Sequence, residues 1–288
     1  MRRRWTAAAA VAAGAMLAAA LAGPVAASPT AGDGPGTLII GGEDAPHARA
    51  AVSVHVGGRF VCSGVAVEIA GVAAVMTAAH CVSDPPAGAA RTVTGWAGPA
   101  VAGSARPAPA AAVEGVAVRA GTDRTAGPLV EAAEVVIRPG WSWGAGPGRV
   151  DDAALIRPAS PLRGVSPLRL ADARRGQVVR AQGWGITSID ATQPPTVLQA
   201  ATMRVVRAER CAGMMPGMTA GEVCVAAPAA HACYGDSGGP ILGVSGGRWA
   251  VVGLASRARE LCDGATIYSA VDPTVRAWAA STVRAWRQ

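Results

Sequence analysis

CYGDSGGP, the stretch at residues 233–240, places Ser237 in a glycine-rich turn directly after a cysteine. A serine hydroxyl is a weak nucleophile at neutral pH, so a catalytic role requires a base and a group that orients the base. It also requires an oxyanion hole for the charge on an attacked carbonyl, and the backbone N–H groups of Gly235 and Ser237 are suited to this. Taken alone, the stretch is equally typical of an ordinary Asp/Gly-rich turn.

Two upstream stretches contain the missing residue types. Residues 76–81 read MTAAHC and place His80 beside a cysteine at the end of an apolar run. Residues 151–156 read DDAALI, in which an acid opens a short apolar strand. A serine, a histidine and an acid can together form a base-activated nucleophile. The three stretches therefore favour nucleophilic catalysis over a purely structural turn.

With His first, Asp second and Ser third along the chain, these motifs resemble the chymotrypsin/trypsin-like serine endopeptidases. The resemblance covers nearly everything from Ile39 to Gln288. It implies an all-β fold of two antiparallel six-stranded Greek-key β-barrels with a C-terminal α-helix. It also implies protein or peptide substrates, no cofactor and a monomeric enzyme.

The resemblance assigns a role to each member of this set. Ser237 is the nucleophile, His80 is its base, and Asp152 fixes the tautomer of the imidazole. Counted from the Ala-Leu-Ile strand, Asp152 aligns with the family aspartate, so Asp151 is expected to be an exposed neighbour. Ser256 matches the family serine that supports the aspartate.

The N-terminal residues 1–27 are typical of a secretory signal peptide. An arginine-rich start is followed by an alanine-rich apolar stretch and by small residues at a cleavage site. The alternative is a membrane anchor, because the apolar stretch is nearly long enough to span a bilayer. Removal is favoured, which predicts a secreted, extracellular protein.

The remaining chain is predicted to consist of a pro-segment and a peptidase domain. Residues 28–38 are rich in Pro and Gly, and the peptidase domain covers residues 39–288. Within it we expect a first barrel at about 39–157, a second barrel at about 158–271 and a helix at about 273–288.

Ile39-Ile40-Gly41-Gly42 resembles the mature start of the family. There, the new N-terminal ammonium of Ile39 pairs with the carboxylate before the nucleophile, here Asp236, and the pairing orders the site after cleavage. The residue before the cleavage point is Leu38, neither Arg nor Lys, so a trypsin-like activating protease would not cut there. The alternative is that the two isoleucines only begin a strand.

Composition narrows the classes of function. The chain has 288 residues with 11 aromatic ones (Trp 8, Tyr 2, Phe 1), so small aliphatic residues must fill a large core. Its 26 basic residues are all arginine and give a net charge of +7. Beyond residues 2–4 they form no compact run, so a nucleic-acid site is not predicted.

The six cysteines fit export to an oxidising compartment. Six cysteines allow 15 pairings, and their spacing does not choose among them. The resemblance implies three disulfides, Cys62–Cys81, Cys211–Cys224 and Cys233–Cys262. No metal site is predicted, because there is no Cys-x-x-Cys or His-rich spacing.

Periodicity predicts strands in short apolar runs and a helix at the end of the chain. The strand-like runs are at residues 51–67, 71–76, 116–119, 130–137, 177–185 and 248–256. Residues 83–112 are rich in Pro, Ala and Gly, and we expect a mostly unstructured surface insertion there. Residues 158–169 are expected to link the two barrels.

Substrate preference is read from the specificity pocket that the resemblance implies. His231 stands where trypsin-like enzymes have an aspartate, so a preference for Arg or Lys does not carry over. Ser256-Arg257-Ala258 replaces the usual Ser-Trp-Gly, and Thr266 stands where a glycine often lines the pocket. One interpretation is a narrow pocket for small or medium neutral side chains, which we favour. The other is an acidic preference, with His231 and Arg257 or Arg259 attracting a carboxylate.

These changes also leave a rival function open. The altered pocket and the missing basic residue at the activation point fit a catalytically silent homologue that acts as a secreted binding module. The filled positions for His, Asp and Ser argue for the enzyme.

Overall fold

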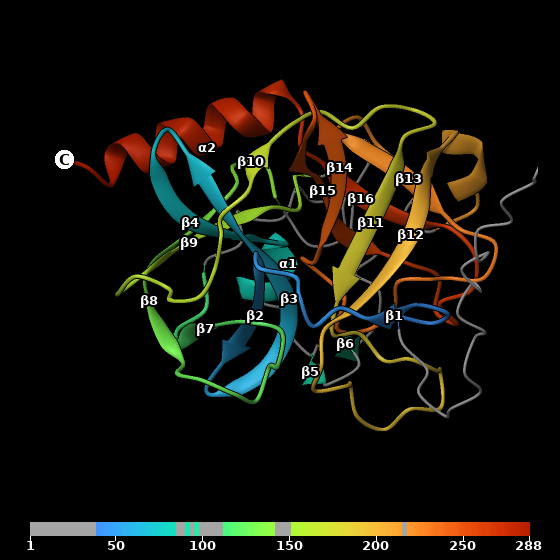
Figure 1. The fold of residues 1–288 in the computed structure, drawn as a ribbon, viewed down its shortest axis with the longest axis horizontal. Helices are drawn as coiled ribbons and strands as arrows, with labels where there is room; N and C mark the ends of the chain where they lie inside the picture. Colours follow the sequence, from blue (N-terminus) through green and yellow to red (C-terminus); the bar gives the residue numbers. More distant parts are fainter. Residues whose placement is uncertain (1–38, 85–89, 93–94, 98–111, 142–150, 215–217) are drawn as a thin grey trace, which may run out of the picture. The chain divides into compact units, whose positions relative to one another are not determined.

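The computed structural model describes residues 39–84, 90–92, 95–97, 112–141, 151–214 and 218–288 (Figure 1). The predicted signal peptide and pro-segment lie outside these residues, as does most of the 83–112 insertion. Within the described part of the chain, no helix is both long and apolar enough to cross a membrane.

The first barrel consists of six antiparallel strands and closes in the order β2-β3-β4-β9-β8-β7. Valine and alanine side chains fill its interior, which fits the shortage of aromatic residues. Its strands are β2 (Ala51–Val56), β3 (Arg59–Ile69), β4 (Val72–Thr77), β7 (Val116–Ala120), β8 (Val130–Ile137) and β9 (Ala154–Pro158).

The second barrel closes in the order β12-β11-β14-β15-β16-β13, through the pairing of β13 with β12. Two short strands, β1 (Glu43–Asp44) and β10 (Arg169–Leu170), add to β12 and β15. The predicted architecture of two six-stranded barrels is confirmed. The strands are β11 (Val178–Gly183), β12 (Gln199–Val206), β13 (Glu222–Ala226), β14 (Pro240–Ser245), β15 (Arg248–Arg257) and β16 (Thr266–Ala270).

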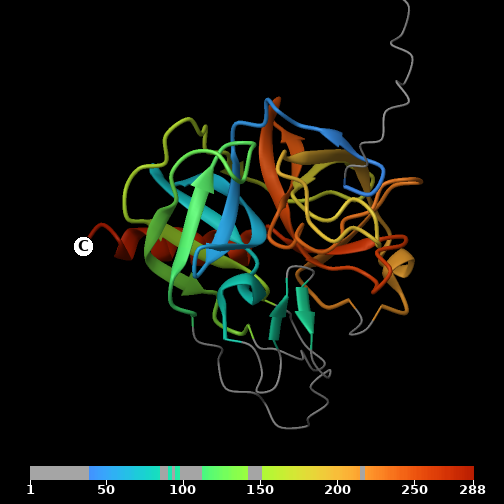
Figure 2. The same ribbon diagram turned by 90° about the horizontal axis from the view of Figure 1, so that it is seen from below.

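The C-terminal helix α2 (Pro273–Ala285) begins at an aspartate cap and ends three residues before the chain does. Asp272 Oδ1 accepts from the N–H of Val275 at 2.9 Å, and a proline occupies the first turn. The buried face of α2 packs into one cluster with Val67 and Met76 of the first barrel and Leu254 of the second. Figures 1 and 2 show α2 lying across the first barrel, although it follows the second in sequence.

Two further short strands lie in the region expected to be unstructured. β5 (Ala90–Thr92) and β6 (Gly95–Ala97) form an antiparallel pair, visible near the lower edge of Figure 2. The expectation for residues 83–112 is a mostly unstructured segment, and these six positions are an exception to it, because backbone pairing satisfies their polar groups in a sequence without apolar periodicity.

All six cysteines form the three expected disulfides, Cys62–Cys81, Cys211–Cys224 and Cys233–Cys262. Each closes a loop of 13 to 29 residues. Closure of loops of this size stabilises a fold by roughly 3 kcal/mol per bridge. The first bridge ties β3 to the helix that carries His80.

Candidate active site

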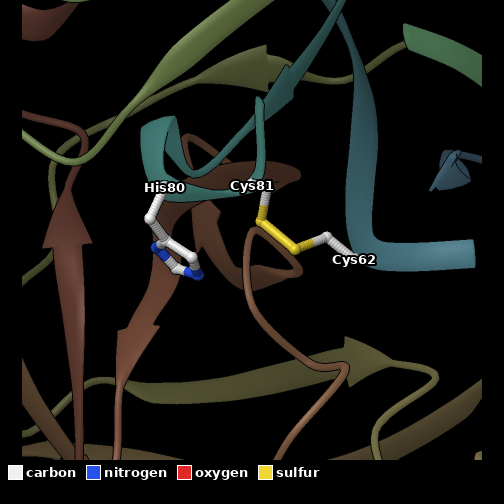
Figure 3. Close-up of side chains that lie close together, drawn as sticks. All are labelled: Cys62, His80 and Cys81. Carbon is white, nitrogen blue, oxygen red and sulfur yellow. A yellow bond between two sulfur atoms is a disulfide. The ribbon is translucent and has the colours of Figure 1, made fainter. Parts of the chain in front are cut away.

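His80 lies on the short helix α1 (Ala79–Val82), which directly follows β4. Its neighbour Cys81 is bonded to Cys62 of β3, so the helix is fixed to the barrel wall (Figure 3). Ligand atoms of Cys62, His80 and Cys81 lie within 4.8 Å of one another, as in a metal site. The two sulfur atoms are bonded to each other and offer no thiolates, so this cluster does not fit a metal ion.

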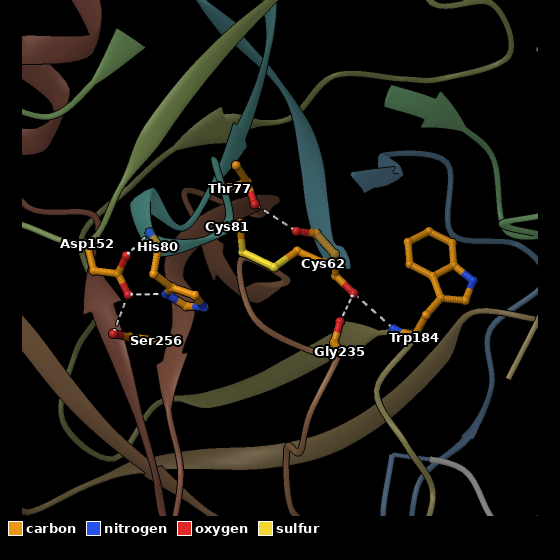
Figure 4. The surroundings of a disulfide bond; sticks show 9 residues. Cys62, Thr77, His80, Cys81, Asp152, Trp184, Gly235 and Ser256 are labelled. Carbon is orange, nitrogen blue, oxygen red and sulfur yellow. Dashed lines mark hydrogen bonds and ion pairs between the residues drawn. A yellow bond between two sulfur atoms is a disulfide. The ribbon is translucent and has the colours of Figure 1, made fainter. Parts of the chain in front are cut away.

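The imidazole of His80 is oriented by a buried carboxylate. Asp152 Oδ2 accepts from His80 Nδ1 at 2.8 Å, and Asp152 Oδ1 accepts from the backbone N–H of His80 at 3.0 Å. Ser256 on β15 donates its hydroxyl to Asp152 Oδ2 at 2.6 Å (Figure 4). Residues from both barrels thus meet at one carboxylate. Nδ1 of His80 carries a hydrogen and donates it in a hydrogen bond to this carboxylate, which itself stays ionised.

Asp152 remains ionised in spite of its burial. The side chain is 1% exposed, and burial alone raises the pKa of a carboxyl group. The charge of His80 and the hydrogen bonds from His80 and Ser256 outweigh this effect and leave the pKa of Asp152 below its usual range. The carboxylate can therefore stabilise a positive charge on the imidazole.

The turn that carries Ser237 packs directly against the segment that leads to His80. Gly238 lies so close to Thr77 and Ala78 that a Cβ atom there would overlap both, and its φ of 74° favours glycine. Ser237 is half-buried. A hydrogen bond between such a hydroxyl and the imidazole often forms only in a substrate complex.

The predicted oxyanion donors are available. Among the described residues, the N–H groups of Gly235 and Ser237 make no backbone hydrogen bond, whereas those of Asp236, Gly238 and Gly239 each have an acceptor. Gly235 has a φ of 97°, a conformation that residues other than glycine rarely adopt. Two unpaired N–H groups in the same turn, one of them on the serine itself, can stabilise an oxyanion.

Asp236 is 2% exposed and accepts hydrogen bonds from the N–H groups of Gly185 (2.8 Å) and Cys233 (2.9 Å). Burial raises its pKa to about 7. Its carboxylate lies against Gly183 and Gly185, where any Cβ atom would overlap it. The Gly-Trp-Gly segment thus leaves space for this carboxylate.

Ile39, the predicted partner of Asp236, is buried in the core of the second barrel together with Tyr268. Burial raises the pKa of Tyr268, and the charge of Asp236 raises it further. In the continuous chain the nitrogen of Ile39 belongs to a peptide bond and carries no charge.

Asp151 is not the exposed neighbour that we expected. It is 8% exposed, and its Oδ1 lies 3.0 Å from Nε of Arg138, a residue that is also buried. Arg138 further donates to Thr274 Oγ1 on α2 at 2.7 Å. The reason lies in the strand pairing. Arg138 directly follows β8, Asp151 lies shortly before β9, and β8 and β9 are neighbours in the first barrel.

Comparison with known proteins agrees with this geometry. The trypsin family model matches residues 39–279. The chain belongs to the trypsin family. The expected membership of the chymotrypsin/trypsin-like serine proteases is thereby confirmed.

Individual relatives are more distant or match only in part. Human kallikrein-12 is 36% identical over 114 residues, which are 37% of this chain and 46% of that protein. Trypsin delta of Drosophila erecta is 35% identical over 116 residues, 37% of this chain and 44% of that protein. The chain thus spans about half the length of the curated relatives it matches. Neuropsin, a serine protease expressed in the limbic system of mouse brain, has a similar fold, with a TM-score of 0.63, 22% identity and coverage of 84% of this chain and 98% of neuropsin.

In this member of the trypsin family, two of the residues considered for the specificity pocket, Arg257 and His231, are bound to other groups of the protein. Arg257 is bound through both terminal nitrogens to the fully buried carboxylate of Glu222 on β13. His231 Nδ1 donates to the carbonyl of Gly264 at 2.8 Å. This ion pair offsets the charge that Arg257 could present to an acidic substrate. Ala258, the residue after Arg257, is half-buried.

Thr266 contributes a buried hydroxyl to the same region. Side chains alternate along a strand, so Thr266 lies on the same face of β16 as Tyr268, which packs with Ala230 and Ala232. Thr266 is 2% exposed, and its Oγ1 has no hydrogen-bond partner among the described residues.

Sequence reasoning missed Ser63 of β3, a fully buried residue that bonds to both sides of the candidate site. It follows Cys62, but no motif marks it. Its partners Trp184, Gly235 and Ser237 are known only from the fold, because they come from the other barrel.

Proposed function

We propose that this protein is a secreted serine endopeptidase that is made as a zymogen. The observation that carries the proposal is the imidazole of His80, held by buried Asp152, together with the packing of the Ser237 turn against Thr77 and Ala78, the residues that lead to His80. Membership of the trypsin family supports the same activity. Protein or peptide substrates and a monomeric state are part of the proposal.

The proposed reaction has two halves. The Ser237 hydroxyl attacks the peptide carbonyl while His80 Nε2 takes its proton, and the N–H groups of Gly235 and Ser237 stabilise the oxyanion. His80 then gives this proton to the leaving amine as the C–N bond breaks, which leaves an acyl-enzyme. Water repeats the sequence, with its proton passing to His80 and back to Ser237 as the acid leaves.

A fluorophosphonate probe tests this function. Protein that begins at Ile39 is expected to react with one equivalent of probe at Ser237, and the same preparation is expected to cleave a mixed peptide library. If folded protein with this N-terminus does neither, the rival function, a secreted binding module without catalysis, replaces the proposal.

The zymogen part of the proposal rests on the buried Asp236 carboxyl. Cleavage after Leu38 by a separate activating protease would turn the nitrogen of Ile39 into an ammonium group able to pair with it. Until then, ionisation of Asp236 is opposed by burial. Cleavage and ordering of the site are in this way coupled.

The uncleaved chain is expected to lose stability as the pH rises. Because the folded state raises the pKa of Asp236 from 3.8 to about 7, the contribution of this group is complete below pH 4 and is lost between about pH 4 and pH 7. A difference of about three pH units corresponds to a loss on the order of 4 kcal/mol. Urea unfolding at a series of pH values measures it. Asp236→Asn should flatten the profile, and an equally steep profile in that variant would contradict the assignment.

We further propose that the pocket accepts small or medium neutral side chains. The neutralised Arg257 and the bulk of Thr266 support this over an acidic preference. Thr266→Gly is expected to raise the kcat/KM ratio of substrates with a large neutral side chain to those with a small one by about tenfold or more, the usual effect of added pocket volume. Thr266→Ser, which removes one methyl group and keeps the hydroxyl, should shift the ratio less. Cleavage profiling on matched peptides measures this, and unchanged ratios in both variants would exclude Thr266 from the pocket.

A further inference from the structure

Every polar atom of Ser63 is hydrogen-bonded, and its N–H and hydroxyl join the two barrels beside the Ser237 turn. Its N–H donates to the carbonyl of Ser237 at 2.9 Å, and its hydroxyl donates to the carbonyl of Gly235 at 2.8 Å. The same hydroxyl oxygen accepts from the N–H of Trp184 at 3.0 Å, and Thr77 donates to the carbonyl of Ser63 at 2.9 Å. Figure 4 labels the partners Thr77, Gly235 and Trp184 and marks these hydrogen bonds with dashed lines.

The two residues whose carbonyls Ser63 binds, Gly235 and Ser237, are the two of residues 235–239 whose N–H groups make no backbone hydrogen bond within the described part of the chain. Glycine is conformationally permissive, so Gly235 does not by itself fix the direction of its backbone groups. The peptide bond after Gly235 is held at both ends, by Ser63 at the carbonyl and by the carbonyl of Cys233 at the N–H of Asp236. The peptide bond after Ser237 is held in the same way, by Ser63 and by the carbonyl of Ala255.

Ser63 also joins this turn to the segment beside Asp236. Trp184, whose N–H binds the Ser63 hydroxyl, precedes Gly185, whose N–H binds Asp236 Oδ1. The single hydroxyl therefore sets the spacing between the Ser237 turn and the strand end that holds the buried carboxyl.

We propose that Ser63 is a positioning residue for the oxyanion hole. Its hydroxyl holds the Gly235 carbonyl and the Trp184 N–H at a fixed separation and so aims the N–H groups of Gly235 and Ser237. This inference rests on the proposed peptidase function, and Ser63 itself touches no reacting atom.

The test uses the Ser63→Ala variant of protein that begins at Ile39. Without the hydroxyl, the Gly235 carbonyl and the Trp184 N–H each lose a partner and the donors lose their alignment. Loss of one oxyanion donor lowers kcat by about 10²- to 10³-fold, so misalignment is expected to lower it by roughly tenfold to a hundredfold with little change in KM.

A peptide aldehyde separates this role from general destabilisation. Its carbonyl carbon bonds to Ser237 Oγ, and its oxygen then occupies the oxyanion position as a hemiacetal. Its affinity should fall in Ser63→Ala by the same factor as kcat, whereas the matching peptide alcohol, which forms no such bond, should bind unchanged.

Ser53→Ala is the matched control. Ser53 lies opposite Ser63 in the β2–β3 ladder and is equally buried, but its hydroxyl bonds to His55 and to the carbonyl of Arg119. This variant should retain kcat and aldehyde affinity. If Ser63→Ala does not fold, Ser63→Gly removes the same hydroxyl and carries the same expectation.

The outcomes are distinct. A folded Ser63 variant with unchanged kcat and aldehyde affinity overturns the inference, as does a loss confined to KM or an equal loss in Ser53→Ala. A wild-type protein that does not react with the fluorophosphonate overturns the proposed function instead.

Discussion

Replacing Ser237 by alanine is expected to lower kcat by about 10⁶-fold and to abolish reaction with a fluorophosphonate. Without Oγ no acyl-enzyme forms, and His80 and Asp152 have no nucleophile to activate. Nearly all of the rate enhancement that Ser237, His80 and Asp152 give together is therefore lost. Some rate above that in water should remain, because the N–H groups of Gly235 and Ser237 still bind the oxyanion. Single-turnover cleavage of a peptide that the wild type accepts measures the loss.

The Ser237 variant also carries an expectation about binding. Its affinity for the peptide should stay close to that of the wild type, since Thr266 and His231, which we propose to line the pocket, are unchanged. Retention of more than about one hundredth of the wild-type kcat would place the nucleophile elsewhere.

Asp152→Asn is expected to lower kcat by about 10⁴-fold while leaving the fold intact. The carboxylate now accepts from the backbone N–H and from Nδ1 of His80, and from the Ser256 hydroxyl. An asparagine has only one carboxamide oxygen to accept from these donors, and its N–H₂ group would face Nδ1 of His80. Because an N–H₂ group donates, this arrangement favours the tautomer with Nδ1 unprotonated. Nε2 would then carry a proton and could not take one from Ser237.

Asp151→Asn is the matched control for this prediction. It makes the same chemical change at the adjacent residue, where the carboxylate binds Arg138 and not His80. We expect this variant to unfold at lower urea concentration, because it leaves a buried arginine without its charged partner, but to keep most of its kcat. Equal losses of kcat in the two variants would contradict the assignment of Asp152.

The motifs predicted the fold because its recognition depends on local sequence. The residues around His80 and Ser237 form tight turns whose glycines and small side chains are visible in the chain itself. The architecture followed from the family that these motifs resemble, and the strand boundaries shifted by only a few residues.

What could not be predicted depends on partners far apart in sequence. The burial of Asp151 requires Arg138, and the neutralisation of Arg257 requires Glu222, a residue 35 positions earlier on another strand. Ser63 contacts Trp184 and Gly235, which are 121 and 172 positions away. A charged or hydroxyl side chain in the sequence does not reveal which distant group will meet it, so its environment becomes known only once the barrels are formed.

The course of α2 has a consequence for how the chain can be divided. The helix belongs to the C-terminal half by sequence, yet its buried face contacts strands of the N-terminal half. A break in the segment between β9 and β10 would therefore leave two fragments that share one apolar cluster, and α2 of the second fragment would still pack against the first. Such a nicked molecule should stay assembled, and the two halves, when expressed separately, should associate through this apolar cluster.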